Sequence, residues 1–311
     1  MNVLVTGATG VVGRRLVPLL IGDGHRVAAI ARAPGKREDL ARIGATPVNA
    51  DLFAPESLRR AASGCDAIVN LATHMPATFA QSIRRNSWRE NDRVRRVGSA
   101  NLLEAALAEG VVRFVQESFA PAYPDCGDRW IEETMPLEPV RYNESILDAE
   151  KSATRFTEAG GTGVVLRFAG FYGPDSRFLA EIIRQVRRGR APLPGPPNAF
   201  VSSVSHDDAA TAAAAALALP SGIYNVADDE PVTHRGYFDS LARALGVPPP
   251  KLPPRWMAWF LGSLGEMMSR SLKISNRKLK ASSPWRPMYP SVREGWPTVV
   301  ASMPAESEDA A

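Results

Sequence analysis

The sequence predicts an α/β protein built on a doubly wound parallel sheet, with a smaller C-terminal portion. Short apolar runs alternate with amphipathic stretches as far as Phe168, and a glycine-rich turn joins the first run to the first amphipathic stretch. Such alternation predicts parallel strands joined by right-handed crossover helices on both faces. The 311 residues are 45% hydrophobic and 23% charged, which is typical of a soluble globular protein and excludes a disordered, collagen-like or disulfide-stapled chain.

Six short apolar runs are the expected strands of this sheet. They lie at 2–6, 26–31, 46–50, 66–71, 111–117 and 163–168. Helical periodicity fills the gaps, notably at 11–21, at 55–62 behind an initial proline, and in long patterns at 79–109 and 143–159. Ser145 and Asp148 have capping-box spacing, which predicts that the last of these helices starts near Ile146.

The regular alternation ends after residue 173, where proline and glycine become frequent. Loops are expected at 192–197 and 247–254, with an Ala-rich helix at 209–219, a strand from Gly222 and a helix at 237–245. The stretch 256–268 is apolar nearly all round, which is typical of a segment that covers a substrate pocket or an interface. A membrane-surface or partner-binding role is the alternative.

Charge and cysteine content narrow the range of partners. The net charge of +4 allows an anionic ligand but is too small to indicate nucleic acid. Cys65 and Cys126 are the only cysteines, so we expect neither a metal site nor a disulfide framework. The N-terminus runs into a strand pattern without a signal-peptide layout, and no apolar run is long enough for a bilayer. We therefore expect a cytoplasmic protein with a small-molecule substrate.

The strongest local signal is TGATGVVG at 6–13, between the first strand and the first helix. Gly7 permits a tight turn, Gly10 lets the backbone approach a pyrophosphate, and Gly13 lets helix and strand pack closely. The helix N-terminus then presents N–H groups and a positive dipole to phosphates. This pattern in this context predicts a dinucleotide cofactor.

The end of the second strand indicates which dinucleotide is bound. NAD-binding proteins place an acidic residue there for the ribose hydroxyls, whereas this chain has Arg32. A guanidinium suits a 2′-phosphate, and Lys36 and Arg37 are potential supports. We therefore expect NADP(H) rather than NAD, the alternative being that Arg32 is a solvated surface residue.

Several motifs in sequence order resemble the extended or atypical short-chain dehydrogenase/reductases of the NAD-dependent epimerase/dehydratase type. TGATGVVG resembles TGxxGxxG, GSANLLEAA (98–106) resembles GTxNLLEAA, LRFAGFYGP (166–174) resembles LRxxxxYGP, and SHDDAA (205–210) resembles HVDDxA. The resemblance implies a Rossmann domain over 1–172, which regains a strand and a helix from 200–220, and a substrate-binding cap over 173–311. The residues implied in cofactor binding are Gly7, Thr9, Gly10, Val11, Val12, Gly13, Asp51, Leu52, Leu71, Ala72, Asn91 and Lys151, besides Arg32.

The catalytic positions of the family are not all matched. Its enzymes use a Tyr-x-x-x-Lys pair on one helix face, in which the tyrosine exchanges a proton with substrate and the lysine lowers the tyrosine's pKa. Lys151 follows the fifth strand at the expected distance, and Leu147 stands four residues before it. The family's serine position falls on Phe119, with Ser118 one residue away as a candidate.

Two further side chains are candidates for the missing proton donor. His74 follows the turn that passes the cofactor, and histidine titrates near neutrality. Tyr142 lies in the loop before the helix that carries Lys151. The leading hypothesis is an NADP(H)-binding carbonyl/alcohol oxidoreductase for a small organic substrate. The alternatives are a non-redox cyclase, lyase or isomerase, a nucleotide-sensing regulator, and an NAD-dependent sugar-nucleotide epimerase. A homodimer through helices 79–109 and 143–159 would resemble the family.

Overall fold

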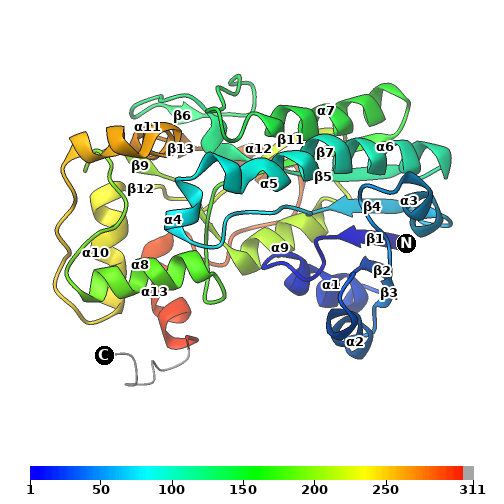
Figure 1. Ribbon diagram of the computed structural model, residues 1–311, viewed down its shortest axis with the longest axis horizontal. Helices are drawn as coiled ribbons and strands as arrows, with labels where there is room; N and C mark the ends of the chain where they lie inside the picture. Colours follow the sequence, from blue (N-terminus) through cyan, green and yellow to red (C-terminus); the bar gives the residue numbers. More distant parts are fainter. Residues whose placement is uncertain (304–311) are drawn as a thin grey trace.

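The computed structural model describes residues 1–303 and contains a seven-stranded, all-parallel sheet. Its strands lie in the order β11-β7-β5-β4-β1-β2-β3 (Figure 1). They are β1 (Asn2–Thr6), β2 (Arg26–Ile30), β3 (Thr46–Val48), β4 (Ala67–Asn70), β5 (Arg113–Phe119), β7 (Thr162–Phe168) and β11 (Gly222–Val226). The order reverses between β1 and β4, as in a doubly wound sheet, so the predicted fold class is confirmed.

Helices cover both faces of this sheet. The helices that flank it are α1 (Gly13–Gly22), α2 (Pro34–Arg42), α3 (Pro55–Ala62), α6 (Ser99–Ala108), α7 (Ser145–Glu158) and α9 (His206–Ala215). Alternate residues of β1 point to opposite faces of the sheet, and each face has its own hydrophobic core. Val3 and Val5 pack with the side chains of α1 and α9, whereas Leu4 packs with those of α3, α6 and α7.

The long helix expected over 79–109 is broken into several pieces. They are α4 (Phe79–Ser82), a 3₁₀ turn (Arg85–Trp88), α5 (Arg89–Arg93) and a π-helical turn (Val94–Gly98) that continues into α6. The π turn contains Arg95, whose buried guanidinium binds Glu117 of β5. A single wide turn of this kind lets one side chain leave the regular helical register.

Two helix starts also differ from expectation. The capping box proposed for Ser145 and Asp148 is wrong: α7 already begins at Ser145, and the hydroxyl of Ser145 is buried without a hydrogen-bond partner among the described residues. The Ala-rich helix spans His206–Ala215 rather than 209–219, because Ser205 caps it. The Oγ of Ser205 accepts the N–H of Asp208 at 2.9 Å and donates to that residue's carboxylate at 2.7 Å.

The C-terminal portion packs around a core of its own. Its helices are α8 (Arg177–Arg187), α10 (His234–Ala244), α11 (Gly262–Ser269), α12 (Arg277–Ser282) and α13 (Val292–Ala301). Three small strand pairs join them: β8 (Gly170–Tyr172) with β10 (Ser203–Ser205), β9 (Phe200–Val201) with β12 (Val232–Thr233), and β6 (Trp130–Ile131) with β13 (Lys273–Ile274). Through α9 and β11 the chain returns to the main sheet within this portion, so the two parts interleave.

Candidate cofactor and active site

The glycine-rich turn between β1 and α1 has the geometry that a dinucleotide requires. Gly7 has φ +66°, and a Cβ there would overlap the carbonyl of Leu71 after β4. A Cβ on Gly13 would overlap the backbone of Gly7, so the helix and the turn pack directly on each other. At Gly10 a Cβ would approach only the carbonyl oxygen of Gly7, at 3.2 Å, and Gly10 is exposed. The turn is therefore closed on the protein side and open toward solvent.

The N-terminus of α1 behind this turn is bonded in part by the turn's own backbone, because the N–H groups of Arg14 and Arg15 donate to the carbonyl oxygens of Gly10 and Val12. Its N-cap, Val12, makes no side-chain capping hydrogen bond, so the first N–H groups are not satisfied by a cap. Arg15, one turn into the helix, binds Asp175 and Asp207 at 2.6 Å each. Burial alone would lower the pKa of Arg15, but its two carboxylate partners outweigh this and raise it. These ion pairs join the start of α1 to the C-terminal portion.

The residues expected at the adenosine end lie around the ends of β2 and β3. Arg32 is exposed just beyond β2, and the exposed Lys36 lies in the first turn of α2. Asp51 follows β3, and its Oδ1 accepts the N–H of Phe53 at 3.0 Å. Leu52 packs against the π-helical turn, because a Cβ built on Gly98 would contact the side chain of Leu52. The structure thus brings Arg32 and Asp51 to neighbouring strand ends, since β2 pairs with β3.

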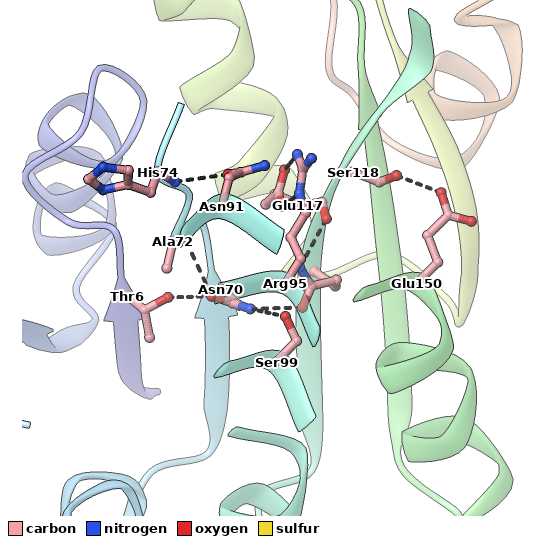
Figure 2. A network of polar contacts seen from close by, with 11 residues as sticks. Thr6, Asn70, Ala72, His74, Asn91, Arg95, Ser99, Glu117, Ser118 and Glu150 are labelled. Carbon is pink, nitrogen blue, oxygen red and sulfur yellow. Dashed lines mark hydrogen bonds and ion pairs between the residues drawn. The ribbon is translucent and has the colours of Figure 1, made fainter. Parts of the chain in front are cut away.

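A polar network fixes the loop after β4 (Figure 2). Asn70 accepts from the Oγ1 of Thr6 at 2.5 Å and from the N–H of Ala72 at 3.2 Å. Its amide nitrogen donates to Ser99 and Gln116, at 3.1 and 2.8 Å. These bonds hold Leu71 and Ala72 against the glycine-rich turn, where the sequence placed the cofactor.

Asn91 supports this loop from the interior of the protein. It is fully buried, and its Oδ1 accepts the backbone N–H of His74 at 2.9 Å. The imidazole of His74 is exposed and points away from Asn91 and Ser118 (Figure 2). The backbone of His74 is therefore part of the scaffold, while its side chain lies apart from the other proton-donor candidates.

Ser118 lies at the carboxyl end of β5 inside a buried ionic network. Its Oγ donates to Oε1 of Glu150 at 2.6 Å. The guanidinium of Arg167 binds both oxygens of Glu150 at 2.8 Å and the hydroxyl of Tyr123 at 2.7 Å. Burial alone would lower the pKa of Arg167, yet the hydrogen bonds and charge of Glu150 raise it, whereas burial raises the pKa of Tyr123 to about 12. The Ser118 hydroxyl is thus engaged by a structural carboxylate.

Tyr142 is enclosed by apolar side chains between α7 and the C-terminal portion. Its ring packs on Trp88 with 4.3 Å between centroids, and its hydroxyl lies 2.7 Å from Sδ of Met267. Val140 and Leu264 complete this cluster. Burial raises the pKa of Tyr142 above its usual value.

Helix α7 has a buried stripe and an exposed stripe. The buried stripe packs on β5 and β7 and contains Ile146, Ala149, Glu150 and Ala153. Leu147 and Lys151 lie on the exposed stripe, and Leu147 is 47% exposed. The structure therefore brings Ser118 to α7 through Glu150 but does not bring Lys151 to Ser118, Tyr142 or His74.

The ionic partners within this region were missed by the sequence reasoning. Glu150 and Glu117 each neutralise a buried arginine, and Arg270 donates to the backbone carbonyls of Tyr123 and Glu138. The sequence pattern could have predicted that Glu150 is buried, because Glu150 lies between Ala149 and Ala153 on the apolar stripe of an amphipathic helix.

The family model of the NAD dependent epimerase/dehydratase family matches residues 3–227. The chain belongs to this family. The match covers the main sheet except for Asn2, the first residue of β1, and it covers the whole of the glycine-rich turn. The resemblance seen in the sequence motifs is thereby confirmed.

Relatives and solved structures of this family match nearly the whole chain. A 3-diazoavenalumate denitrifying reductase from Streptomyces sp. is 31% identical over 95% of this chain and 99% of its own. A 2-alkyl-3-oxoalkanoate reductase from Shewanella oneidensis is 27% identical over 87% of this chain and 73% of its own. The UDP-glucose 4-epimerase of Thermus thermophilus, solved with NAD, has TM-score 0.78 and 28% identity over 97% of this chain and 98% of that one.

The two relatives are described as reductases, and the solved structure is an epimerase in complex with NAD. The open glycine-rich turn and the uncapped N-terminus of α1 fit the pyrophosphate of such a cofactor. Within residues 1–303, no helix combines the length and apolar character needed to cross a membrane.

Proposed function

We propose that the protein is an NADP(H)-dependent reductase that acts on a small organic substrate at a carbonyl/alcohol centre. The observation that carries the proposal is the glycine-rich turn, closed by Gly7 and Gly13 and open at Gly10, with the exposed Arg32 at the end of the neighbouring strand. The bound nicotinamide supplies a hydride, and the chain's own residues bind, orient and protonate.

Each part of the cofactor has a set of residues on this chain. Backbone groups of 7–13 and the N-terminus of α1 bind the pyrophosphate, and Asp51 and Leu52 line the adenine end. Leu71 and Ala72, held by the Asn70 network, lie along the cofactor beside the turn. Asn91 acts through the His74 backbone and keeps this loop in place. The residues proposed to contact cofactor are Gly7, Thr9, Gly10, Val11, Val12, Gly13, Arg32, Asp51, Leu52, Leu71 and Ala72.

Arg32 is proposed to select the phosphorylated cofactor. A guanidinium at the end of β2 binds a 2′-phosphate through paired hydrogen bonds, whereas the ribose hydroxyls of NAD require an acceptor there. Lys36, close by in the first turn of α2, adds positive charge on the same side.

Reduction of a carbonyl also needs a proton at the substrate oxygen, and we assign this role to Tyr142. Ser118 is already bound to Glu150, and the side chain of His74 is exposed and points away from Ser118 (Figure 2). Tyr142 has a hydroxyl with no strong acceptor, since its neighbour within 2.7 Å is a thioether sulfur. A substrate oxygen that displaces Met267 would receive a better hydrogen bond from Tyr142.

A second candidate function is reductive removal of a diazo group, favoured by the 31% identical denitrifying reductase. The reacting species is the diazonium form of the substrate. Its carbon–nitrogen bond breaks, N₂ leaves with the bonding electron pair, and a C–H bond forms with the electron pair of the hydride. The reaction consumes no proton. A site with a weakly acidic donor is compatible with such a reaction.

Cofactor titration tests the proposed function. Purified protein is titrated with NADPH and NADH by fluorescence, together with Arg32→Ser and the control Arg26→Ser at the opposite end of β2. We expect NADPH to bind tighter than NADH, Arg32→Ser to weaken NADPH binding at least about tenfold, or 1.4 kcal/mol, and Arg26→Ser to leave both affinities unchanged. Binding of neither nucleotide would overturn the proposal, and equal loss in both variants would overturn the role of Arg32.

The reaction class is then tested at 340 nm with a panel of carbonyl compounds and an aryl diazonium salt. NADPH consumption with a carbonyl compound supports the leading function, and consumption with release of N₂ supports the second. Conversion of a substrate without net consumption of cofactor would indicate a cyclase, lyase or isomerase instead. Nucleotide-dependent binding to a macromolecule without turnover would indicate a regulator.

A further inference from the structure

Two pairs of residues on and before α7 have the four-residue spacing of the family's tyrosine and lysine. Leu147 and Lys151 lie on the exposed stripe, which faces away from β5 and β7. Tyr142 and Ile146 are buried, and Ile146 lies on the stripe that packs on these strands. The two pairs therefore lie on different sides of the helix, and at most one of them faces the strand ends where the cofactor binds.

The hydrogen bond between Ser118 and Glu150 shows which stripe faces those strand ends. Ser118 lies at the carboxyl end of β5, and it reaches Glu150, which is one turn beyond Ile146 on the buried stripe. In doubly wound sheets the ligand lies outside the carboxyl ends of the strands. The buried stripe, with Ile146, is thus the one directed to the reacting end of the site.

We propose that Tyr142 and Ile146 occupy the positions which the family fills with tyrosine and lysine, so that this site keeps the proton-donating tyrosine and has an apolar side chain in place of the lysine. The inference rests on the proposed function and deepens it. Tyr142 is then the catalytic residue that touches substrate, and Ile146 is a positioning residue. Lys151 has no part in the proton transfer.

The charged groups that face Tyr142 do not replace a lysine. Burial raises its pKa, Arg95 and Arg270 lower it in part, and Glu266 raises it. Arg95 is bound at 2.9 Å to both carboxylate oxygens of Glu117. Arg270 donates to two backbone carbonyls and to Glu266. Both arginines are thus engaged elsewhere, and the phenol stays protonated at neutral pH.

A neutral phenol gives the site a preferred direction. It can donate a hydrogen bond and a proton to the oxygen of a carbonyl being reduced, whereas oxidation of an alcohol needs a phenolate that accepts the proton. We therefore infer that the site favours substrates reduced without a strong acid, such as electron-poor carbonyl compounds, and oxidises alcohols slowly.

The ionisation of Tyr142 can be measured without cofactor or substrate. The six tyrosines are titrated by tyrosinate absorbance at 295 nm, and the difference between wild type and Tyr142→Phe isolates Tyr142. We expect Tyr142 to ionise at a higher pH than an ordinary tyrosine, whose pKa is about 10, because burial raises the pKa of Tyr142. The titration of Ile146→Lys is compared in the same way with that of the double variant Tyr142→Phe/Ile146→Lys. In the presence of the ammonium introduced by Ile146→Lys, Tyr142 should ionise about one to three pH units lower than in the wild type, because an opposite charge close by favours the phenolate.

Leu147→Lys is the matched control, since it places the same ammonium one residue away on the exposed stripe and should leave the titration unchanged. Far-UV circular dichroism confirms that each variant is folded, and the comparison of wild type with Tyr142→Phe stands even where Ile146→Lys does not fold. Ionisation of Tyr142 near pH 10 or below would overturn the proposal. So would a shift caused by Leu147→Lys, or an upward shift of the Tyr142 ionisation in Lys151→Met. Failure of nucleotide binding would contradict the proposed function and leave this titration readable.

Discussion

The Oγ of Ser118 donates a 2.6 Å hydrogen bond to Oε1 of Glu150, an oxygen that Arg167 also binds at 2.8 Å. Three elements meet in this contact, because Ser118 ends β5, Glu150 lies on α7 and Arg167 lies on β7 in register with Ser118. The serine hydroxyl is nearly inaccessible, and it donates its hydrogen bond to a carboxylate that Arg167 also binds. This arrangement assigns Ser118 to the scaffold of the site.

Replacing Ser118 by alanine should therefore change stability more than chemistry. The variant loses a buried hydrogen bond to a charged acceptor, which contributes about 1.5–3 kcal/mol. Urea unfolding measures this loss, and Ser63→Ala, at an exposed serine, is the control and should stay within about 0.5 kcal/mol. A fall in kcat of a hundredfold or more, with unfolding free energy unchanged, would instead make Ser118 a catalytic residue.

Gly10 offers a sharper test of the cofactor cradle than Gly7 or Gly13. An alanine at Gly7 or Gly13 would overlap the backbone and disturb folding, whereas at Gly10 its Cβ approaches the carbonyl oxygen of Gly7 at 3.2 Å and meets no other atom within 4 Å. We expect Gly10→Ala to keep its thermal midpoint within a few degrees and to bind NADPH at least about tenfold more weakly, or 1.4 kcal/mol.

The control for this variant is Gly22→Ala at the other end of α1, where a Cβ meets nothing within 4 Å. It should keep the affinity for NADPH and be stabilised slightly, because alanine restricts the unfolded chain more than glycine does. Unchanged NADPH affinity in Gly10→Ala would mean that the pyrophosphate does not lie over this turn.

The sheet was predictable because its information is local. Each of the six apolar runs expected as strands overlaps a strand of the main sheet, and the spacing of Gly7, Gly10 and Gly13 is set by backbone contacts within one turn. The π-helical turn at Arg95 was not predictable, because the partner of the Arg95 side chain, Glu117, lies 22 residues away. Contacts between distant segments leave no periodic trace in a single sequence.

The stripe of α7 that faces the sheet could have been found, although the sequence reasoning followed Lys151 instead. Ile146, Ala149, Ala153 and Phe156 repeat at the spacing of one helix face, and Tyr142 lies four residues before the first of them. A lysine at the expected distance from a strand is a weaker signal than this apolar stripe. Which residues surround the hydroxyl of Tyr142 depends on Trp88 and Met267, and only the folded chain shows that.

His206 gives the fold a dependence on pH. It is the first residue of α9, and its ring packs against the backbone of Gly173 and lies 5.9 Å from the ring of Phe171. Burial, and then the charge of Arg15, lower the pKa of His206 to about 4, from 6.5. Between these two values the unfolded chain binds a proton that the folded chain does not.

Stability should therefore fall as the pH drops from about 6.5 to 4, with His206 accounting for about 3 kcal/mol of the loss. His206→Gln should flatten this part of the curve of unfolding free energy against pH, whatever its effect at pH 7.5. His234, whose pKa burial also lowers to about 4, acts with the same sign, so part of the slope should remain until it too is replaced. Urea unfolding at half-unit pH steps measures the slope. An undiminished slope in His206→Gln would show that the His206 imidazole is protonated in the folded protein.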